Sequence, residues 1–203
     1  MASSENSMPQ RPEGPPLGKV RWRRFAILFV PALAAAAVLI GLTAAGAVAA
    51  NISVSGSAFE ISSSQLNGTG FEQFGGEVTG GNATRPVAIS GIKTATLANL
   101  CQSVAVGPIT LRIAAGGGGT PVSASNLIVD ADQQSGNATF HNITIGQDAS
   151  TLTEDPGVTG PAGSFGEQAD SVTIDNLQQN TWLTTAGTFT LPGFSLTFGK
   201  PCY

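Results

Sequence analysis

The stretch Ile109-Thr110-Leu111-Arg112-Ile113 alternates apolar and polar side chains without a break. A period of two places every second side chain on the same face of an extended chain, which is typical of a β-strand with one buried face. The stretch therefore predicts a strand. The same pattern recurs in other short segments from residue 51 onward: Ile52/Val54, Val104/Val106, Ile143/Ile145, Val172/Ile174 and Phe194/Leu196/Phe198.

Glycine, asparagine and proline separate these segments, and many short strands with frequent turns predict an all-β fold, either a sandwich or barrel-like. Residues 51–203 are enough to bury one hydrophobic core, so we expect a single domain there. The nearest candidate for a helix, Lys93 to Val104, is rich in threonine and alanine and has little apolar surface to bury. The polar segment Asp132 to Asn137 predicts a hairpin turn.

Three of the segments end in the same dipeptide, at Asn99-Leu100, Asn126-Leu127 and Asn176-Leu177. Their spacings of 27 and 50 residues are not the fixed period of a solenoid. We interpret them as strands that end in similar asparagine turns, with a β-helix as the alternative.

A different kind of segment precedes the predicted strands. Phe25 to Ala50 is a run of 26 uncharged residues, directly after Lys19, Arg21, Arg23 and Arg24. An apolar helix of about 18 residues or more can cross a bilayer, and the basic flank keeps its own end in the cytoplasm. The run predicts a transmembrane signal-anchor over residues 25–50. It places residues 51–203 outside the cell membrane as a single-pass protein, and residues 1–24 form a disordered basic cytoplasmic tail.

Cleavage is the alternative to a retained anchor. Ala47-Val48-Ala49 matches the small-residue pattern of a signal peptidase site, and cleavage near Ala49 would secrete the domain. The apolar part of a signal peptide usually has about 7–15 residues, so the length of this run favours the anchor.

The exported part is acidic. It has four basic residues against eleven carboxylates, a net charge of −7. A nucleic-acid-binding domain needs a basic patch, so this balance excludes nucleic acid as a partner.

Cys101 and Cys202 are the two cysteines of the chain, and both follow the apolar run. In an oxidising compartment such a pair predicts one disulfide, with two free thiols as the alternative. With His141 as the single histidine, the chain also falls short of a closed zinc shell, so we predict no metal site.

Five segments and the terminal cysteine Cys202 form a pattern that is specific enough to compare with a known family. The segments are Gly68-Thr69-Gly70-Phe71, Asn99-Leu100-Cys101-Gln102-Ser103, Ile145-Gly146-Gln147-Asp148-Ala149-Ser150, Phe165-Gly166-Glu167-Gln168-Ala169-Asp170 and Thr185-Ala186-Gly187-Thr188-Phe189. Together they resemble an actinobacterial family of small exported proteins of unknown function, over about residues 20–203. Members of that family are often labelled "cholesterol esterase". The resemblance implies an actinobacterial envelope protein, and it supplies no catalytic residue.

An esterase of the serine type needs a nucleophile, a histidine base and an orienting acid. The nearest match to a nucleophile elbow is Ala162-Gly163-Ser164-Phe165-Gly166, but its surroundings predict a loop. In α/β-hydrolases the histidine follows the serine in the chain, whereas His141 precedes Ser164. We therefore predict no catalytic residue and interpret His141 as a strand residue.

Other groups of residues also have plain structural interpretations. Gly116 to Gly119 lacks the lysine of a phosphate loop and predicts a flexible connection. Asp130 and Asp132 do not complete a calcium loop and predict a solvated acidic face. The carboxylates Glu154/Asp155 and Glu167/Asp170 are expected in loops.

These observations predict a non-catalytic, membrane-tethered domain of the cell envelope that has a structural or interaction role and needs no cofactor. Its expected partners are the membrane, through residues 25–50, and an envelope protein or lipid. Two alternatives remain: a module that binds a lipid or sterol between apolar faces rich in phenylalanine, and the esterase of the family label.

Overall fold

The computed structural model describes residues 22, 29, 56–81, 83–155 and 157–203. The chain divides into two compact units, Met1–Ala50 and Asn51–Tyr203. The predicted tail (1–24), the predicted anchor (25–50) and the Ile52/Val54 segment lie outside the described residues, apart from Trp22 and Phe29. In the part of the chain that is described, no helix is both long enough and apolar enough to span a membrane.

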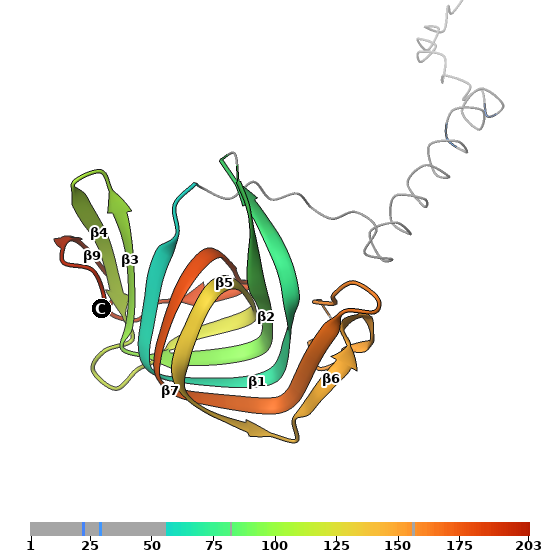
Figure 1. The fold of residues 1–203 in the computed structure, drawn as a ribbon. Coiled ribbons are helices and arrows are strands. Elements are labelled where there is room, and N and C mark those ends of the chain that lie inside the picture. The colour runs from blue at the N-terminus through green and yellow to red at the C-terminus, as the bar shows by residue number, and fades with distance from the viewer. Residues whose placement is uncertain (1–21, 23–28, 30–55, 82, 156) are drawn as a thin grey trace, which may run out of the picture. The chain divides into compact units, whose positions relative to one another are not determined.

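The described part of the second unit is all-β, as predicted (Figure 1). Every strand pairing within it is antiparallel, so the β-helix alternative, which requires parallel strands, is wrong. The elements are β1 (Phe59–Gly80), β2 (Ala83–Ala98), β3 (Leu100–Val106), β4 (Ile109–Ala115), β5 (Val122–His141), β6 (Thr144–Asp148), the 3-10 turn η1 (Ala149–Thr151), β7 (Phe165–Thr185), β8 (Thr188–Thr190) and β9 (Ser195–Gly199).

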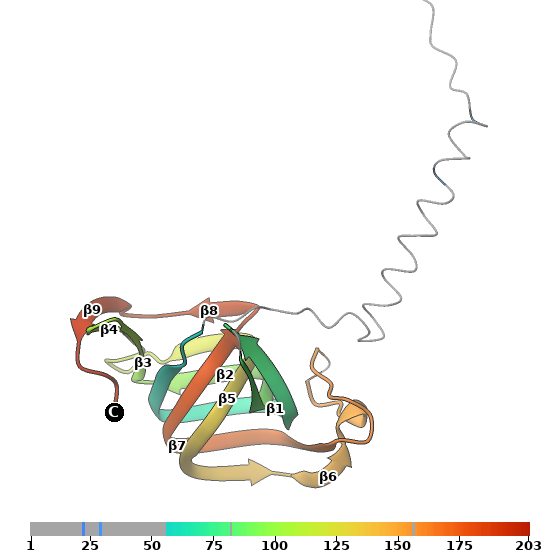
Figure 2. The same ribbon diagram turned by 45° about the horizontal axis from the view of Figure 1, so that its top comes forward.

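Four long strands close on themselves. β1 pairs with both β2 and β7, and β5 pairs with the same two strands, so the order β1-β2-β5-β7 forms a complete ring. Figures 1 and 2 show these strands bending around a common centre. The ring confirms the barrel-like form of the predicted fold. Its interior holds the main hydrophobic core, which includes Leu66, Phe71, Ile92, Leu127, Val172, Ile174 and Leu177.

The three Asn-Leu pairs share an unusual backbone conformation. Asn99, Asn126 and Asn176 have φ angles of 51°, 47° and 53°, in the left-handed region that asparagine enters more readily than most residues. The expectation that strands end there is confirmed at Asn99, because β2 ends at Ala98 and β3 then follows it along β1 in the same register. It is wrong at Asn126 and Asn176, because β5 and β7 continue through them. The leucine after each asparagine is buried in the core.

The predicted hairpin at Asp132 to Asn137 is also wrong, because β5 runs through it without reversing. The pairing between β5 and β7 shifts register at three places between Asp130 and Asn137. Such bulges insert extra residues and bend a strand. The polar, turn-like composition of this segment therefore reflects a bulged strand whose residues 132–139 are exposed.

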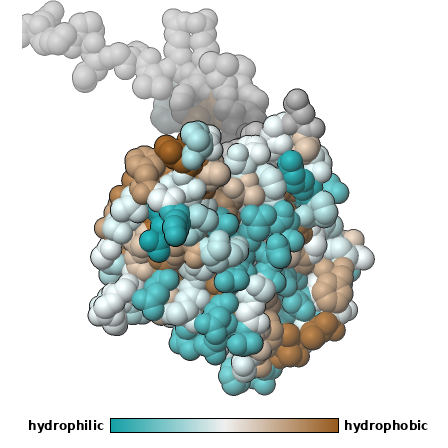
Figure 3. All heavy atoms as spheres, turned by 60° about the vertical axis from the view of Figure 1, so that its left-hand side comes forward, coloured by the Kyte–Doolittle hydropathy of each residue, from teal (hydrophilic) through white to brown (hydrophobic). Residues whose placement is uncertain are grey.

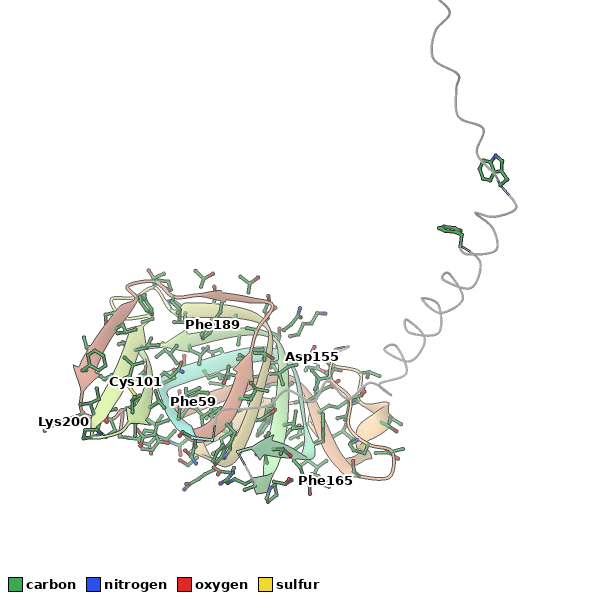
Figure 4. The ribbon with its side chains drawn as sticks, turned by 90° about the horizontal axis from the view of Figure 1, so that it is seen from above. Phe59, Cys101, Asp155, Phe165, Phe189 and Lys200 are labelled. Carbon is green, nitrogen blue, oxygen red and sulfur yellow. A yellow bond between two sulfur atoms is a disulfide. The ribbon has the colours of Figure 1, made fainter. Side chains whose placement is uncertain are left out.

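A smaller sheet extends from the ring. We call β3, β4 and β9 the wing; β3 connects it to the ring by pairing with Glu60 to Ser62 of β1. The predicted disulfide is confirmed on the wing, where Cys101 and Cys202 are bonded with their Cα atoms 5.8 Å apart. Figure 4 shows Cys101 and Lys200 at the wing side of the domain, away from Asp155 and Phe165.

Candidate functional site

The wing has one apolar and one polar face. Residues that are directly opposite each other in antiparallel strands point to the same face, and the register pairs Val104 with Leu111 and Leu111 with Phe198. What we call the apolar face of the wing consists of Val104, Val106, Ile109, Leu111, Ile113, Leu196 and Phe198.

The C-terminal residues cover the part of the polar face formed by the buried Cys101 and Ser103, whereas Arg112 and Thr197 on the same face are exposed. The backbone N–H of Cys202 donates to the Glu60 carboxylate over 3.2 Å and to Ser103 Oγ over 3.0 Å. Ser103 Oγ donates to the same carboxylate over 2.8 Å. Arg112 Nε lies 3.1 Å from Cys101 Sγ, on the same side. The disulfide therefore fastens the end of the chain over this face.

Within residues 56–81, 83–155 and 157–203, no segment covers the apolar face in this way. Val106 is 53% exposed, Leu196 is 50% exposed and Phe198 is 66% exposed. Alternation in the Phe194/Leu196/Phe198 segment predicts a buried face, and that prediction is wrong for this strand. Figure 3 turns the wing side forward and shows hydrophobic residues at the surface beside hydrophilic ones. A soluble domain rarely exposes neighbouring large apolar side chains unless they contact something else.

The apolar face continues into the interior of the ring. Gln102 of β3 is opposite Ile61 of β1, and both line an internal cavity with the buried Leu100. Phe189 of β8 also lines this cavity and is 40% exposed. The cavity volume is about 40 Å³, which is room for one or two water molecules and not for a sterol.

A second, open cleft lies at the part of the ring that β5 forms with its bulges. It has a volume of about 310 Å³. Phe71 and Phe140 line it with their ring centres 5.3 Å apart. Gln73 and Gln134 add amide groups to the lining. The cleft reaches the lower end of the size range of small-molecule sites and has the matching mixture of apolar and polar groups.

The two residues tested for esterase chemistry lie in different surroundings. His141, at the end of β5, is opposite Ser171 of β7 and lines an open groove of about 470 Å³. Ser164 is in the loop before β7, as expected, and its Oγ donates to the carbonyl of Pro161 over 2.7 Å. Sequence reasoning did not pair His141 with Ser171, because strand register decides that contact. The nearby Asp170 accepts a hydrogen bond of 2.6 Å from Asn142 Nδ2.

The predicted acidic groups separate into buried and exposed residues. Asp130 is only 7% exposed, and burial raises its pKa to about 6. Asp132 is exposed and accepts hydrogen bonds from Asn180 and Trp182 over 2.7 and 2.8 Å. The prediction of a solvated acidic face is therefore confirmed for Asp132 and wrong for Asp130. The expectation of loop positions for Glu167 and Asp170 is wrong, since both are on β7.

The sequence patterns did not indicate that Glu72 and Asp155 form a buried pair of carboxyl groups. Glu72 of β1 is fully buried and Asp155 is 2% exposed. Glu72 Oε1 accepts a 2.7 Å hydrogen bond from the backbone N–H of Asp155. The pair fixes the loop after η1 on the outside of the ring. No sequence signal joins two carboxylates so far apart in the chain.

Burial is the main reason that the pKa of each of these two carboxyl groups is raised. The backbone hydrogen bond from Asp155 lowers the pKa of Glu72, and the charge of Asp155 raises it again. Glu72 Oε2 and Asp155 Oδ2 are both buried without a hydrogen-bond partner in the described chain. A proton on one of the two groups would reduce this unfavourable burial of charge.

The remaining candidates have structural positions. Gly116 to Gly119 lies in the connection between β4 and β5, as predicted. Within the described residues, no three side chains of histidine, cysteine, aspartate or glutamate come together as metal ligands.

Comparison with known proteins gives one match. Residues 55–203 match a family of unknown function, DUF6230. Neither a curated protein nor a solved structure matches the chain.

Proposed function

For a chain that belongs to the DUF6230 family of unknown function, we propose a non-catalytic interaction domain of the cell envelope, tethered to the membrane by residues 25–50. The domain meets another envelope component through the apolar face of the wing. The exposure of that face is the observation that carries this proposal.

Three features of the wing support a contact surface. Its exposed side chains are large and adjacent, with Phe198 and Leu196 on one strand and Ile109 and Val106 on the others. Arg112 is the one charged residue within the three strands, and it is on the opposite face. The disulfide and the ring hold the sheet in place, so the wing loses little conformational freedom when it binds a partner.

The test uses two neighbouring residues that point to opposite faces of β3. A photo-crosslinking amino acid replaces Val106 on the apolar face or Ala105 on the polar face of the full chain, and intact cells are irradiated. We expect crosslinked products with the probe at position 106 and not at 105. An absence of products at 106, with the protein present at normal levels, would reject the wing as a contact surface.

The non-catalytic part of the proposal has its own test. We expect the purified protein to hydrolyse a soluble ester no faster than buffer, and His141→Ala to behave like the parent. Two contacts support this expectation: Ser164 Oγ donates to the carbonyl of Pro161, and His141 lies opposite Ser171 in the strand register. Turnover that disappears in His141→Ala, Ser164→Ala or Ser171→Ala with an unchanged circular dichroism spectrum would reject it.

A second candidate function is a lipid-binding module, favoured by the cleft beside Phe71 and Phe140. The internal cavity of about 40 Å³ is too small for a whole acyl chain, so a lipid would occupy the open cleft. Native mass spectrometry of the protein extracted in mild detergent would show a bound lipid, and Ala138→Trp, which fills the cleft, would remove it.

A further inference from the structure

The two outer strands of the sheet differ in how far they are protected against pairing with other chains. Proteins protect exposed sheet edges with charges, prolines, bulges or short strands. At one edge, β6 contains a register shift between Ile145 and Gln147 and ends in the charged Asp148. At the other edge, β9 pairs with β4 in unbroken register. Ser195 to Gly199 contains neither a charge nor a proline.

The side chains at this unprotected edge are symmetric in character. Phe194-Ser195-Leu196-Thr197-Phe198 reads the same in side-chain type in both directions from Leu196. All five residues are exposed. An antiparallel copy of the segment, centred on Leu196, would place like beside like: leucine with leucine, serine with threonine, and phenylalanine with phenylalanine.

We propose that β9 pairs with β9 of a second copy of this chain, antiparallel and centred on Leu196. A two-fold axis through Leu196 makes the contact isologous, as in most homodimers. The two wings then form one continuous sheet, in which the unpaired backbone groups of both edges are hydrogen-bonded. Opposite residues share a face, so the cross-strand Leu-Leu and Phe-Phe pairs extend the apolar face, and such pairs stabilise antiparallel sheets.

The segments that would pair carry no charges that oppose the contact. The five residues of β9 are uncharged, as are all the residues that would lie opposite them. An anionic membrane surface would suit this domain less well, because the net charge of residues 51–203 is −7. The pairing concerns the edge of the wing, so it goes beyond the proposed function, which concerns the apolar face.

The register gives a sharp test with two cysteine variants. In the proposed dimer Ser195 is opposite Thr197 of the second copy, whereas each residue is two positions away from its own equivalent. Directly opposite residues have Cβ atoms about 5 Å apart, and a disulfide cannot span Cα atoms more than about 7 Å apart. Full-length Ser195→Cys and Thr197→Cys chains, carrying different tags, are expressed together and oxidised mildly. We expect a disulfide-linked species that carries both tags.

Each variant expressed alone is the matched control and should give at most a small fraction of that product. No mixed product, or equal products from the single variants, would overturn the pairing, provided that the Cys101–Cys202 bond shows both variants to be folded. Such a result would leave the photo-crosslinking test at Val106 unaffected.

Two lysine substitutions separate the edge from the apolar face. Leu196→Lys puts two positive charges opposite each other and should reduce the mixed product at least tenfold. Val106→Lys, on the same face but two strands away, should leave it within about twofold of its original level. A loss of product in Val106→Lys would show that the two copies meet face to face and would overturn the edge pairing.

Discussion

Asp130 is the residue whose ionisation we expect to affect stability most clearly. It lies on β5 between Ile89 of β2 and Leu183 of β7 in the strand register. Burial raises the pKa of its carboxyl group from 3.8 to about 6. The folded state therefore binds a proton more tightly than the unfolded state does. The contribution of the protonated Asp130 to stability is complete below pH 3.8 and is lost as the pH rises through 6.

The corresponding prediction concerns Asp130→Asn. A pKa difference of this size corresponds to a loss of free energy of unfolding on the order of 2–3 kcal/mol between pH 4 and pH 7.5. Between these two pH values, the free energy of unfolding of Asp130→Asn should therefore fall by about 2–3 kcal/mol less than that of the parent. Urea unfolding of residues 51–203 measures both. Asp132→Asn, at an exposed position, controls for removal of a charge. Parallel pH curves for the parent and Asp130→Asn would contradict the prediction.

At the scale of the strands, asparagines with positive φ allow long strands to bend around one core. Asn126 lies inside β5 with φ at 47°, and the next residue, Leu127, is 3% exposed. The bend lets the following leucine point inward without an end to the strand. A residue with a Cβ and no short polar group pays about 1–2 kcal/mol for this conformation.

We therefore expect Asn126→Ala to lower the free energy of unfolding by about 1 kcal/mol, whereas Asn126→Gly changes it by a few tenths at most. Chemical denaturation of residues 51–203 measures both. Because Asn126 is exposed, packing contributes little to the difference. Equal destabilisation by the two substitutions would show that the side chain, and not the backbone conformation, matters there.

At the scale of the whole domain, the disulfide connects the C-terminus to the wing across 101 residues. A bond that closes a loop of this length is worth about 4–5 kcal/mol in the chain-entropy model. We expect the double substitution Cys101→Ser/Cys202→Ser to lower the free energy of unfolding by that order. It should also expose the polar face of the wing, which hydrogen exchange at Ser103 and Arg112 would report.

The sequence of the whole chain also predicts a topology. With residues 1–24 inside the cell and residues 51–203 outside, protease added to intact protoplasts should digest the domain and leave the N-terminal tail. An N-terminal tag and a C-terminal tag followed by immunoblotting distinguish the two parts. Protection of the C-terminal tag until the protoplasts are lysed would contradict an exported domain.

Local pattern was enough for the fold class, because a period of two is visible in any short segment such as Ile109 to Ile113. It was also enough for the pairing of Cys101 with Cys202, since two cysteines allow one intramolecular bond. The turn predicted at Asp132 to Asn137 failed, because polar residues and glycine fit a bulged, exposed strand as well as they fit a reversal of the chain.

Tertiary structure decided the rest. The pairing of strands depends on contacts between residues far apart in the chain, and a short segment does not indicate them. The sequence therefore could not show that His141 lies opposite Ser171. Burial also depends on tertiary contacts. Leu196 and Ile174 occur in similar alternating segments, yet Leu196 is exposed on the wing, whereas Ile174 is 6% exposed inside the ring. The alternation of side chains determines that a strand has an apolar face, but only the neighbouring strands determine what covers it.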